Sequence, residues 1–240
     1  AGKWMLFTFV ISYLLFWLPT PYVVFQPGSA EVIRPMVQVQ NGDAEQEGSF
    51  LLTTVRMTYS NVASLFLAQI DPYAQVQKKS SVFLEGESPQ EYSARQEYVM
   101  LTSQSNAIQA AYNKANIPYE IQTAGVMIVQ IVDDMPAAEV LRAGDQIVKL
   151  DEQPIGSSDE VFAFTAKKKA GDTVTVTYKR KGKLHTAQLV LAELPPENGG
   201  KPRAGLGIVP VDMQTIAVEK DKEVTITAGD IGGPSAGLMF

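Results

Sequence analysis

One serine near the end of the chain has neighbours that could make its hydroxyl a nucleophile. Ser235 follows Gly232, Gly233 and Pro234, and an apolar Ala-Gly-Leu-Met-Phe run follows it. This pattern predicts a tight turn that places the hydroxyl at the start of a helix, where backbone N–H groups are free and the helix dipole is positive. An oxyanion formed there would be stabilised, as acyl transfer requires. Spacing alone also allows a structural turn in which Ser235 only caps the helix.

The composition limits how such a serine could be activated. The chain has no Cys, which excludes cysteine nucleophiles and thiolate metal sites. Its one histidine, His185, lies in an alternating stretch that is typical of a strand with one face in water. We therefore expect the base for Ser235 to be a lysine whose pKa is lowered by burial, and we expect no cofactor and no metal site.

Length and charge exclude other classes of function. A chain of 240 residues is long enough for one or two domains with additional segments. It carries 20 basic and 26 acidic residues, a net charge of −6, and no basic stripe with interleaved aromatic residues. This balance argues against a nucleic-acid partner. No Gly-x4-Gly-Lys-Ser/Thr loop occurs, so any hydrolysis is expected to be independent of ATP.

The N-terminal segment indicates a membrane location. Residues 4–30 carry no charge, and the apolar run as far as Phe25 is long enough to span a hydrocarbon core. Trp4 and Trp17 lie where interfacial aromatic residues are expected, and Lys3 favours an N-terminus inside the cell. We therefore predict a single-pass anchor over residues 1–25, with the bulk of the chain extracytoplasmic. The alternatives are a cleaved signal peptide, for which the residues after Leu18 form a poor cleavage site, and a buried helix of a soluble fold.

Residues 26–118 predict an extracytoplasmic α+β region with no catalytic residue. Short strands are expected at 22–25 and 30–33 around a turn, and further strands at 37–39 and 48–55 around the hairpin-type turn Asn41-Gly42-Asp43. One helix is expected to begin after Asn61 as its cap. A second helix has a better-marked start, with Ser88 as cap, Pro89 at the first position and Glu91 three residues after the cap, and it is expected to stop at 116–118.

Residues 119–193 form a compact module whose motifs resemble a known family. The pattern predicts strands at 126–132 and 146–150, helices at 137–141 and 158–168, and a hairpin from 173 to 191. Four motifs in this order resemble the PDZ domain, most closely the kind found in bacterial proteases: Gly125-Val126-Met127-Ile128, Met135-Pro136-Ala137-Ala138, the run from Leu141 to Ile147, and Tyr178-Lys179-Arg180-Lys181-Gly182.

This resemblance implies peptide binding by strand addition. It places Gly125, Val126, Met127 and Ile128 in the carboxylate loop and the binding strand. The Gly-Leu-Gly-Phe loop of the family is not present as such, because Ala124-Gly125-Val126-Met127 stands in its place. The alternative is that Gly125 only allows a turn and that residues 126–131 belong to the core.

A linker over residues 194–202 leads into strands at 204–211 and 223–226 and then to Ser235. Gly233-Pro234-Ser235-Ala236-Gly237-Leu238 resembles the nucleophile motif of the Lon protease family, which uses a Ser–Lys dyad. An anchor, a PDZ module and a Lon-type serine in this order resemble the membrane-anchored PDZ–Lon endopeptidases of Gram-positive bacteria, the pheromone-processing group. The fold class expected is thus α+β and multidomain: a transmembrane helix, a mixed α/β segment, a PDZ-like β-sandwich or barrel, and over 203–240 the start of a Lon-type proteolytic domain.

The resemblance implies an ATP-independent serine endopeptidase that processes peptides or proteins outside the membrane, with substrate recruited by the PDZ module. Ser235 would be the nucleophile and Gly233 would help to hold the oxyanion. The family's lysine lies further along the chain, and none of Lys201, Lys220 and Lys222 matches its position. The chain is therefore expected to be the N-terminal part of a longer enzyme and to be inactive alone. Family members suggest a homo-oligomer, and the alternative function is a non-catalytic, membrane-tethered PDZ adaptor.

Overall fold

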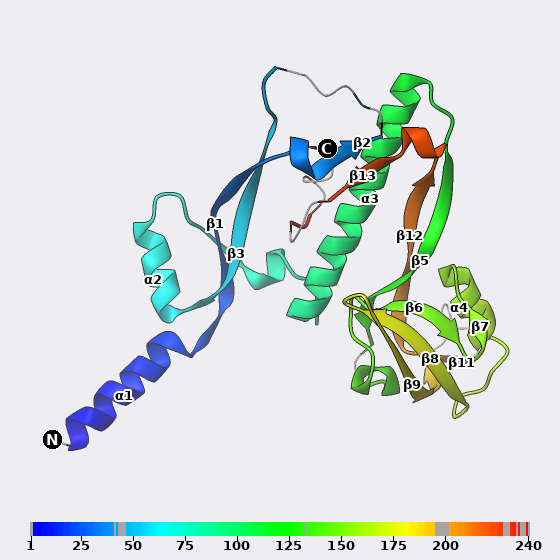
Figure 1. The fold of residues 1–240 in the computed structure, drawn as a ribbon. Coiled ribbons are helices and arrows are strands. Elements are labelled where there is room, and N and C mark those ends of the chain that lie inside the picture. The colour runs from blue at the N-terminus through cyan, green and yellow to red at the C-terminus, as the bar shows by residue number, and fades with distance from the viewer. Residues whose placement is uncertain are drawn as a thin grey trace. The chain divides into compact units, whose positions relative to one another are not determined.

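The computed structural model places most of the chain in two compact units. It describes residues 2–40, 42, 47–132, 134–194, 202–227, 231–233, 235 and 239. The first unit comprises residues 1–33 and 48–87, and the second comprises residues 34–47 and 88–240. Figure 1 labels most of the helices and strands of both, and each unit is described by itself.

The first unit is a three-stranded antiparallel sheet that carries two helices. Its strand order is β3-β1-β4, and its elements are α1 (Gly2–Phe16), β1 (Pro19–Val32), β3 (Leu51–Asn61), α2 (Val62–Ile70), β4 (Gln75–Lys78) and the short helix η2 (Lys79–Ser81). Val23 and Val24 of β1 and Leu52 of β3 are buried and form its small core. Asn61 caps α2 as predicted, since its side chain accepts a hydrogen bond from the Ser64 N–H.

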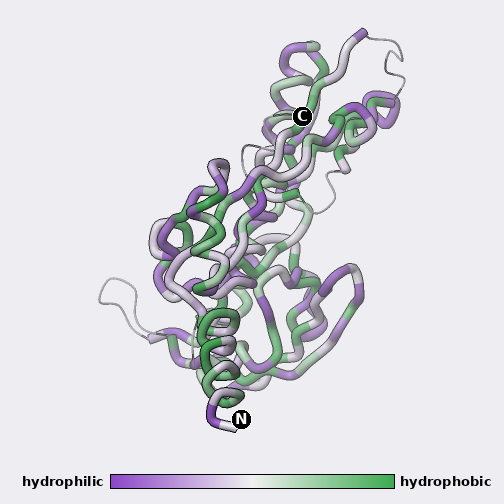
Figure 2. The backbone as a smooth tube through the Cα atoms, turned by 90° about the vertical axis from the view of Figure 1, so that its left-hand side faces the viewer, coloured by the Kyte–Doolittle hydropathy of each residue, from purple (hydrophilic) through white to green (hydrophobic). Residues whose placement is uncertain are grey.

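The N-terminal helix is shorter than the anchor predicted for residues 1–25. α1 ends at Phe16, and Pro19 begins β1, which pairs with β3 on one side and with β4 on the other. The segment 19–25 shares its apolar composition with α1, but its valines are buried by sheet pairing. Figure 2 shows that the helix α1 is mostly hydrophobic. Among the residues that the structure describes, no helix combines enough length and apolar character to cross a bilayer.

Two predicted strand arrangements of this region are wrong. Residues 22–32 lie in one continuous strand, β1, with a bulge between Pro27 and Ala30, and not in two strands around a turn. The strand β2 (Val37–Val39) pairs with β13 (Val224–Ile226), so it does not form a hairpin with residues 48–55. Asn41 and Asp43 lie outside the described residues. Both predictions relied on residues typical of turns, whereas β1 and β2 pair with strands that lie far away in the sequence.

The long helix α3 (Pro89–Ala115) opens the main part of the second unit and confirms its predicted ends. The Ser88 hydroxyl accepts from the Glu91 N–H at 3.3 Å, and Glu91 Oε2 accepts from the Ser88 N–H at 2.8 Å. The helix stops at Asn116, whose φ of 54° is left-handed. Glu91 Oε1 also accepts from the Ile131 N–H at 3.0 Å, which fastens the start of α3 to the end of β5 (Glu120–Ile131).

A six-stranded antiparallel sheet forms the body of the second unit. Its order is β12-β5-β6-β8-β9, with β7 attached to β6. The remaining elements are β6 (Gln146–Leu150), β7 (Gln153–Pro154), α4 (Ser158–Thr165), β8 (Thr173–Arg180), β9 (Lys183–Val190), the pair β10 (Ala192–Leu194) and β11 (Arg203–Gly205), β12 (Ile208–Ala217), and the short helices η1 (Arg34–Met36), η3 (Pro136–Glu139) and η5 (Lys220–Lys222). Burial alternates along β8, where Val174, Val176 and Tyr178 point into the core. The predicted strands and hairpin of this module are present, and the helix predicted at 158–168 is α4, which ends at Thr165. The helix predicted at 137–141 is the short 3₁₀ helix η3.

The second unit extends the predicted PDZ-like module in one important respect. Residues 208–217 were predicted to open a separate Lon-type domain, but they pair along β5 from Ile208–Ile131 to Ala217–Glu120. The division into an anchor, an α+β region, a PDZ-like domain, a linker and a Lon-type start remains a prediction. Figure 1 shows β12 beside β5, on the opposite side of β5 from β6.

Candidate functional site

The strand β12 is the edge strand of the six-stranded sheet. Its ladder to β5 runs along one side, and within the described part of the chain no strand pairs with its other side. A bulge between Val209 and Pro210 interrupts the ladder near its beginning. An unpaired edge presents N–H and C=O groups to which an extended peptide can add.

The turn that leads into β12 is buried and tightly packed. Gly205, Leu206 and Gly207 are all buried, and the Gly207 carbonyl accepts from the Val132 N–H at 2.8 Å. Gly207 has a φ of +73°, and a Cβ at this position would lie 2.5 Å from Cβ of Met135. Only glycine fits here, because both the backbone conformation and the close approach exclude a side chain.

The helix α4 is fastened to the same strand by its first turn. Ser157 caps α4, and Val161 and Phe164 on its inner face enter the core. The Ser158 N–H donates to Oδ1 of Asp212 on β12 at 2.6 Å, so a carboxylate satisfies a free donor at the positive end of the helix. The outer face of α4 carries Phe162, whose ring lies 5.6 Å from the guanidinium of Arg203. The helix α4 thus lies beside β12, and Asp212 of β12 helps to position it.

A buried carboxylate paired with a partly exposed arginine stabilises the sheet near β6 and β8. The Asp145 carboxylate is 1% exposed and accepts from Arg180 Nε at 2.7 Å and from the Arg142 N–H at 2.8 Å, with a further bond from Arg180 Nη2. Hydrogen bonding to this carboxylate raises the pKa of Arg180. The Asp145 backbone carbonyl accepts from the Ile128 N–H at 2.9 Å, which holds this turn against β5. The run from Leu141 to Ile147 therefore has a structural role, because its Asp145 connects this turn to β5 and to Arg180.

The four residues predicted to bind peptide lie on β5, in the middle of the sheet. Val126, Met127 and Ile128 are completely buried, and Gly125 is half-buried. Val126 pairs with Asp212 of β12 on one side and with Ile147 of β6 on the other, and Met127 is paired on both sides in the same way. This pairing argues against β5 as the strand to which a peptide adds, and it favours the alternative that these residues are core.

A better match to the family's loop motif was available in the sequence. Gly205-Leu206-Gly207-Ile208 differs from Gly-Leu-Gly-Phe only at its last position. Its place beyond a Pro/Gly-rich linker, after the rest of the module, favours instead the strand expected at 204–211. The signal that could have found it is the pair of glycines directly before a run of alternating apolar residues.

The structure places Ser235 on a segment next to α3. Ser235 is exposed and has a helical backbone, and Gly233 two residues earlier has a φ of +102°. The Gly233 N–H donates to the Gln96 carbonyl of α3 at 3.3 Å, so the group that an oxyanion would need is engaged in this arrangement. Pro234 and residues 236–238 lie outside the described residues.

Lys222, one of the lysines considered as a base for Ser235, has an environment that does not suit a base. Lys222 forms an ion pair with Glu219, and this hydrogen bond raises its pKa, the opposite of what a general base at neutral pH requires. Lys201 lies outside the described residues. His185 is exposed on β9 and stacks on Tyr178, as expected for a surface strand residue. Within the described ranges no cluster of three or more His, Asp or Glu residues could hold a metal ion.

Comparison with known proteins identifies one domain within the second unit. Residues 99–191 match the family model described as the PDZ domain. The match begins inside α3 and ends after β9, so the chain contains a PDZ domain.

Individual relatives cover the same region. A serine protease Do-like HtrA of Lactococcus lactis subsp. lactis (strain IL1403) is 36% identical over 72 residues, which is 30% of this chain and 18% of that protein. The chain thus spans less than a fifth of this curated relative. The PDZ domain of an SdrC-like protein from Listeria monocytogenes is 37% identical, with 38% of this chain and 93% of that chain covered at a TM-score of 0.34. A solution structure from Geobacillus thermodenitrificans is 40% identical, with 35% and 94% covered at a TM-score of 0.31.

Proposed function

We propose that the chain binds peptides by strand addition to the free edge of β12, with the peptide's end received by the turn Gly205-Leu206-Gly207. The observation that carries this proposal is the edge position of β12 directly after that turn and beside α4. Main-chain hydrogen bonds would supply affinity, and the backbone N–H groups of the turn would receive a C-terminal carboxylate.

Hydrogen exchange with and without peptide tests the location of binding. A library of short peptides with free C-termini is screened by fluorescence polarisation, and each ligand found is compared with its C-terminally amidated form. We expect peptide to slow exchange at residues 208–213, and amidation to weaken binding roughly tenfold, because a charged hydrogen-bond acceptor is lost. The matched control is β9, the opposite edge of the same sheet, which should show no added protection. Protection at β9 or at residues 126–128 in place of β12 would refute the assignment.

We further propose that this PDZ domain recruits substrate for an ATP-independent serine endopeptidase in which Ser235 is the nucleophile and a lysine is the base. The exposed, helical position of Ser235 after Gly233 supports this proposal, and so does the match of the PDZ domain to part of an HtrA serine protease. Hydrolysis would require Gly233 to release Gln96 so that its N–H can hold the oxyanion.

The second candidate is a PDZ adaptor without catalysis, which the pairing of Lys222 with Glu219 favours. The two are separated by measuring cleavage of bound peptides with the full-length protein and with Ser235→Ala. Loss of cleavage with unchanged peptide binding supports the enzyme. Equal cleavage by both proteins rules out Ser235 as the nucleophile, and absence of cleavage by either favours the adaptor.

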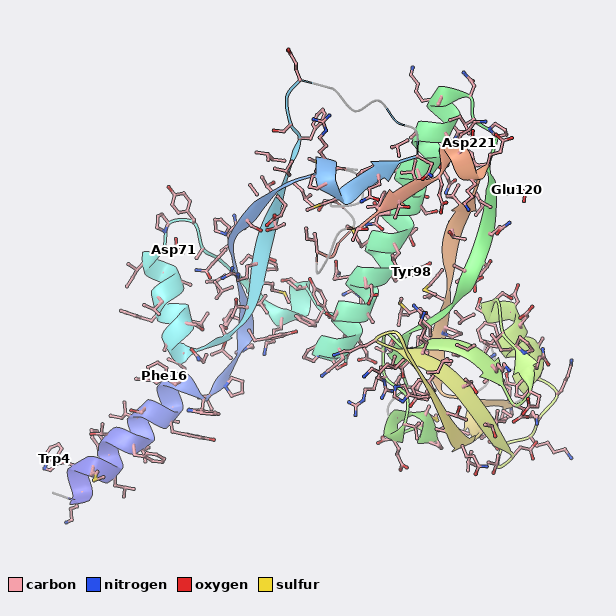
Figure 3. All side chains as sticks on the ribbon, viewed as in Figure 1. Trp4, Phe16, Asp71, Tyr98, Glu120 and Asp221 are labelled. Atoms are coloured by element: carbon pink, nitrogen blue, oxygen red, sulfur yellow. The ribbon has the colours of Figure 1, made fainter. Side chains whose placement is uncertain are left out.

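We also propose that the protein resides at a cell membrane with its bulk extracytoplasmic. The apolar side chains of α1 support this location, since Trp4, Phe9 and Trp17 are each at least 70% exposed. Figure 3 shows side chains projecting from α1 on several sides between Trp4 and Phe16.

A further inference from the structure

The helix α2 has its large apolar residues on the outside. Ala68 is its buried residue, and Ala63, Ser64 and Leu65 are half-buried. Phe66, Leu67 and Ile70 are each about two-thirds exposed, and Tyr73 just beyond the helix is 74% exposed. A helix on the surface of a globular unit normally has the opposite arrangement. We call Val62, Phe66, Leu67, Ile70 and Tyr73 the outer face of α2.

The outer face of α2 continues the apolar surface of α1. The Asn61 side chain caps α2 through Oδ1 and donates from Nδ2 to the Phe16 carbonyl at 2.9 Å, so one amide joins the end of α1 to the start of α2. In Figure 3, Phe16 lies at this junction and Asp71 at the far end of α2. Residues 57–70 carry no charge, just as residues 4–30 carry none. Beyond Lys3 the two helices therefore carry exposed apolar side chains with no charged residue among them, and exposed apolar surface of this kind marks an interaction site when it is contiguous.

Two lysines lie at the same end of the sheet as this junction. Lys78 pairs with Tyr22 near the start of β1, and Asn61 pairs with Pro19 at that start. Lys79 follows directly, and its ammonium lies 5.5 Å from the centre of the Tyr59 ring. Lysines and aromatic residues beside an apolar face are the combination that favours the headgroup region of a bilayer, and lysines add attraction to anionic lipids.

We propose that the outer face of α2 docks on a lipid bilayer that contains anionic lipids, with Lys78 and Lys79 at its headgroups. The first unit would then rest on the membrane through α2 as well as through α1. This inference rests on the proposed membrane location but adds a contact that α1 alone would not make. A bilayer is favoured over a protein partner because the outer face has no charged side chain, and its one polar group, the Tyr73 hydroxyl, suits the headgroup region as aromatic residues of that kind do.

Single-cysteine labelling tests the contact, because the native chain has no Cys. Ile70→Cys on the outer face, Phe9→Cys on α1 and Leu184→Cys on β9 are prepared in the full chain, and each carries an environment-sensitive fluorophore. All three positions are at least two-thirds exposed. Each protein is transferred from detergent into phosphatidylcholine–phosphatidylglycerol vesicles with or without nitroxide groups on the lipid acyl chains. We expect nitroxide quenching at Ile70 and Phe9 to be several-fold that at Leu184, and Phe66→Cys to repeat the result for Ile70.

The outcomes separate this inference from the membrane location itself. Quenching at Phe9 without quenching at Ile70 would overturn the docking of α2 while leaving α1 as the membrane contact. Quenching at neither position would overturn both. A label at Ile70 that is shielded without lipid quenching, in a protein that sediments as a dimer, would overturn the proposal in favour of a second copy as the occupant.

The lysines provide an independent arm. Lys78→Gln with Lys79→Gln is expected to lower partitioning into vesicles with phosphatidylglycerol by about fivefold per lysine, and to have no effect on pure phosphatidylcholine vesicles. The matched control is Lys181→Gln with Lys183→Gln in the β8–β9 hairpin, which makes the same change of charge away from α2. An equal effect of both double variants would show that only net charge matters, and would overturn the role given to Lys78 and Lys79.

Discussion

Replacement of Gly207 by alanine tests the turn to which the peptide's end is assigned. The residue has a φ of +73°, and an added Cβ would lie 2.5 Å from Cβ and 2.7 Å from Cγ of Met135. Because the Met135 Cβ is attached directly to the backbone, the clash cannot be relieved by a side-chain rotation alone. The left-handed conformation costs alanine about 1 kcal/mol, and overpacking adds about 1–3 kcal/mol. We expect Gly207→Ala to lower the free energy of unfolding by about 2–4 kcal/mol.

Gly182 supplies the matched control. It has a φ of +80° in the β8–β9 turn, and a Cβ there would meet no atom within 4 Å. Gly182→Ala should therefore show the backbone cost alone, about 1 kcal/mol. Thermal unfolding measures the difference, since each kcal/mol shifts the Tm of a domain of this size by about 4–8 °C. Titration with a peptide ligand should show weaker binding for Gly207→Ala only. Equal loss of stability in the two variants would refute the close packing of this turn, and unchanged affinity would refute its role in binding.

Three further predictions concern groups that hold the second unit together. Arg180→Met would leave the Asp145 carboxylate buried without its cation, and we expect it to cost about 3 kcal/mol in urea unfolding; a loss below 1 kcal/mol would contradict the pairing. The hydrogen bond from the Thr175 N–H, and after it the hydrogen bond from Lys168, hold the pKa of Asp151 below its ordinary 3.8. The contribution of Asp151 to the free energy of unfolding is therefore fully present above that pH, and it is lost as the pH falls through the folded-state pKa. Asp151→Asn should flatten the acid limb of the stability profile, and an unchanged profile would count against this. Tyr112→Phe removes a buried hydroxyl that donates to a carbonyl of η5 at 2.8 Å, and chemical denaturation should show a loss of about 1 kcal/mol; no change would mean that water replaces the bond.

Signals confined to a few neighbouring residues were sufficient to predict where α2 begins and where α3 begins and ends. The capping groups Asn61, Ser88 and Glu91 form the hydrogen bonds that their spacing predicts, and Asn116 ends α3 in the left-handed conformation. The alternating valines of β8 face the core as their period of two requires. These features depend on contacts within one turn or one strand, which a sequence displays directly.

Pairing between distant segments was not predictable in the same way. Residues 19–25 resemble the apolar helix before them, and only their partners β3 and β4 make them a strand. Residues 208–217 follow a linker and have the alternating pattern of a strand. That pattern does not indicate that their partner is β5. The predicted binding residues 125–128 consequently lie on β5, which is paired with β12 on one side and with β6 on the other. The surroundings of Ser235 depend on Gln96 of α3, more than 130 positions earlier in the chain, which no local motif indicates.

The order of the strands has a practical consequence for anyone who wishes to excise this domain. The family match stops at residue 191, but β12 begins at Ile208. A fragment cut at the match boundary would strip β5 of its neighbour and bare its backbone from residue 120 to 131. An interior strand that has lost its partner can pair with the same strand of another copy, which leads to aggregation. Such a fragment is expected to be insoluble or misassembled when it is expressed. Its failure to bind peptide would then say nothing about the intact domain.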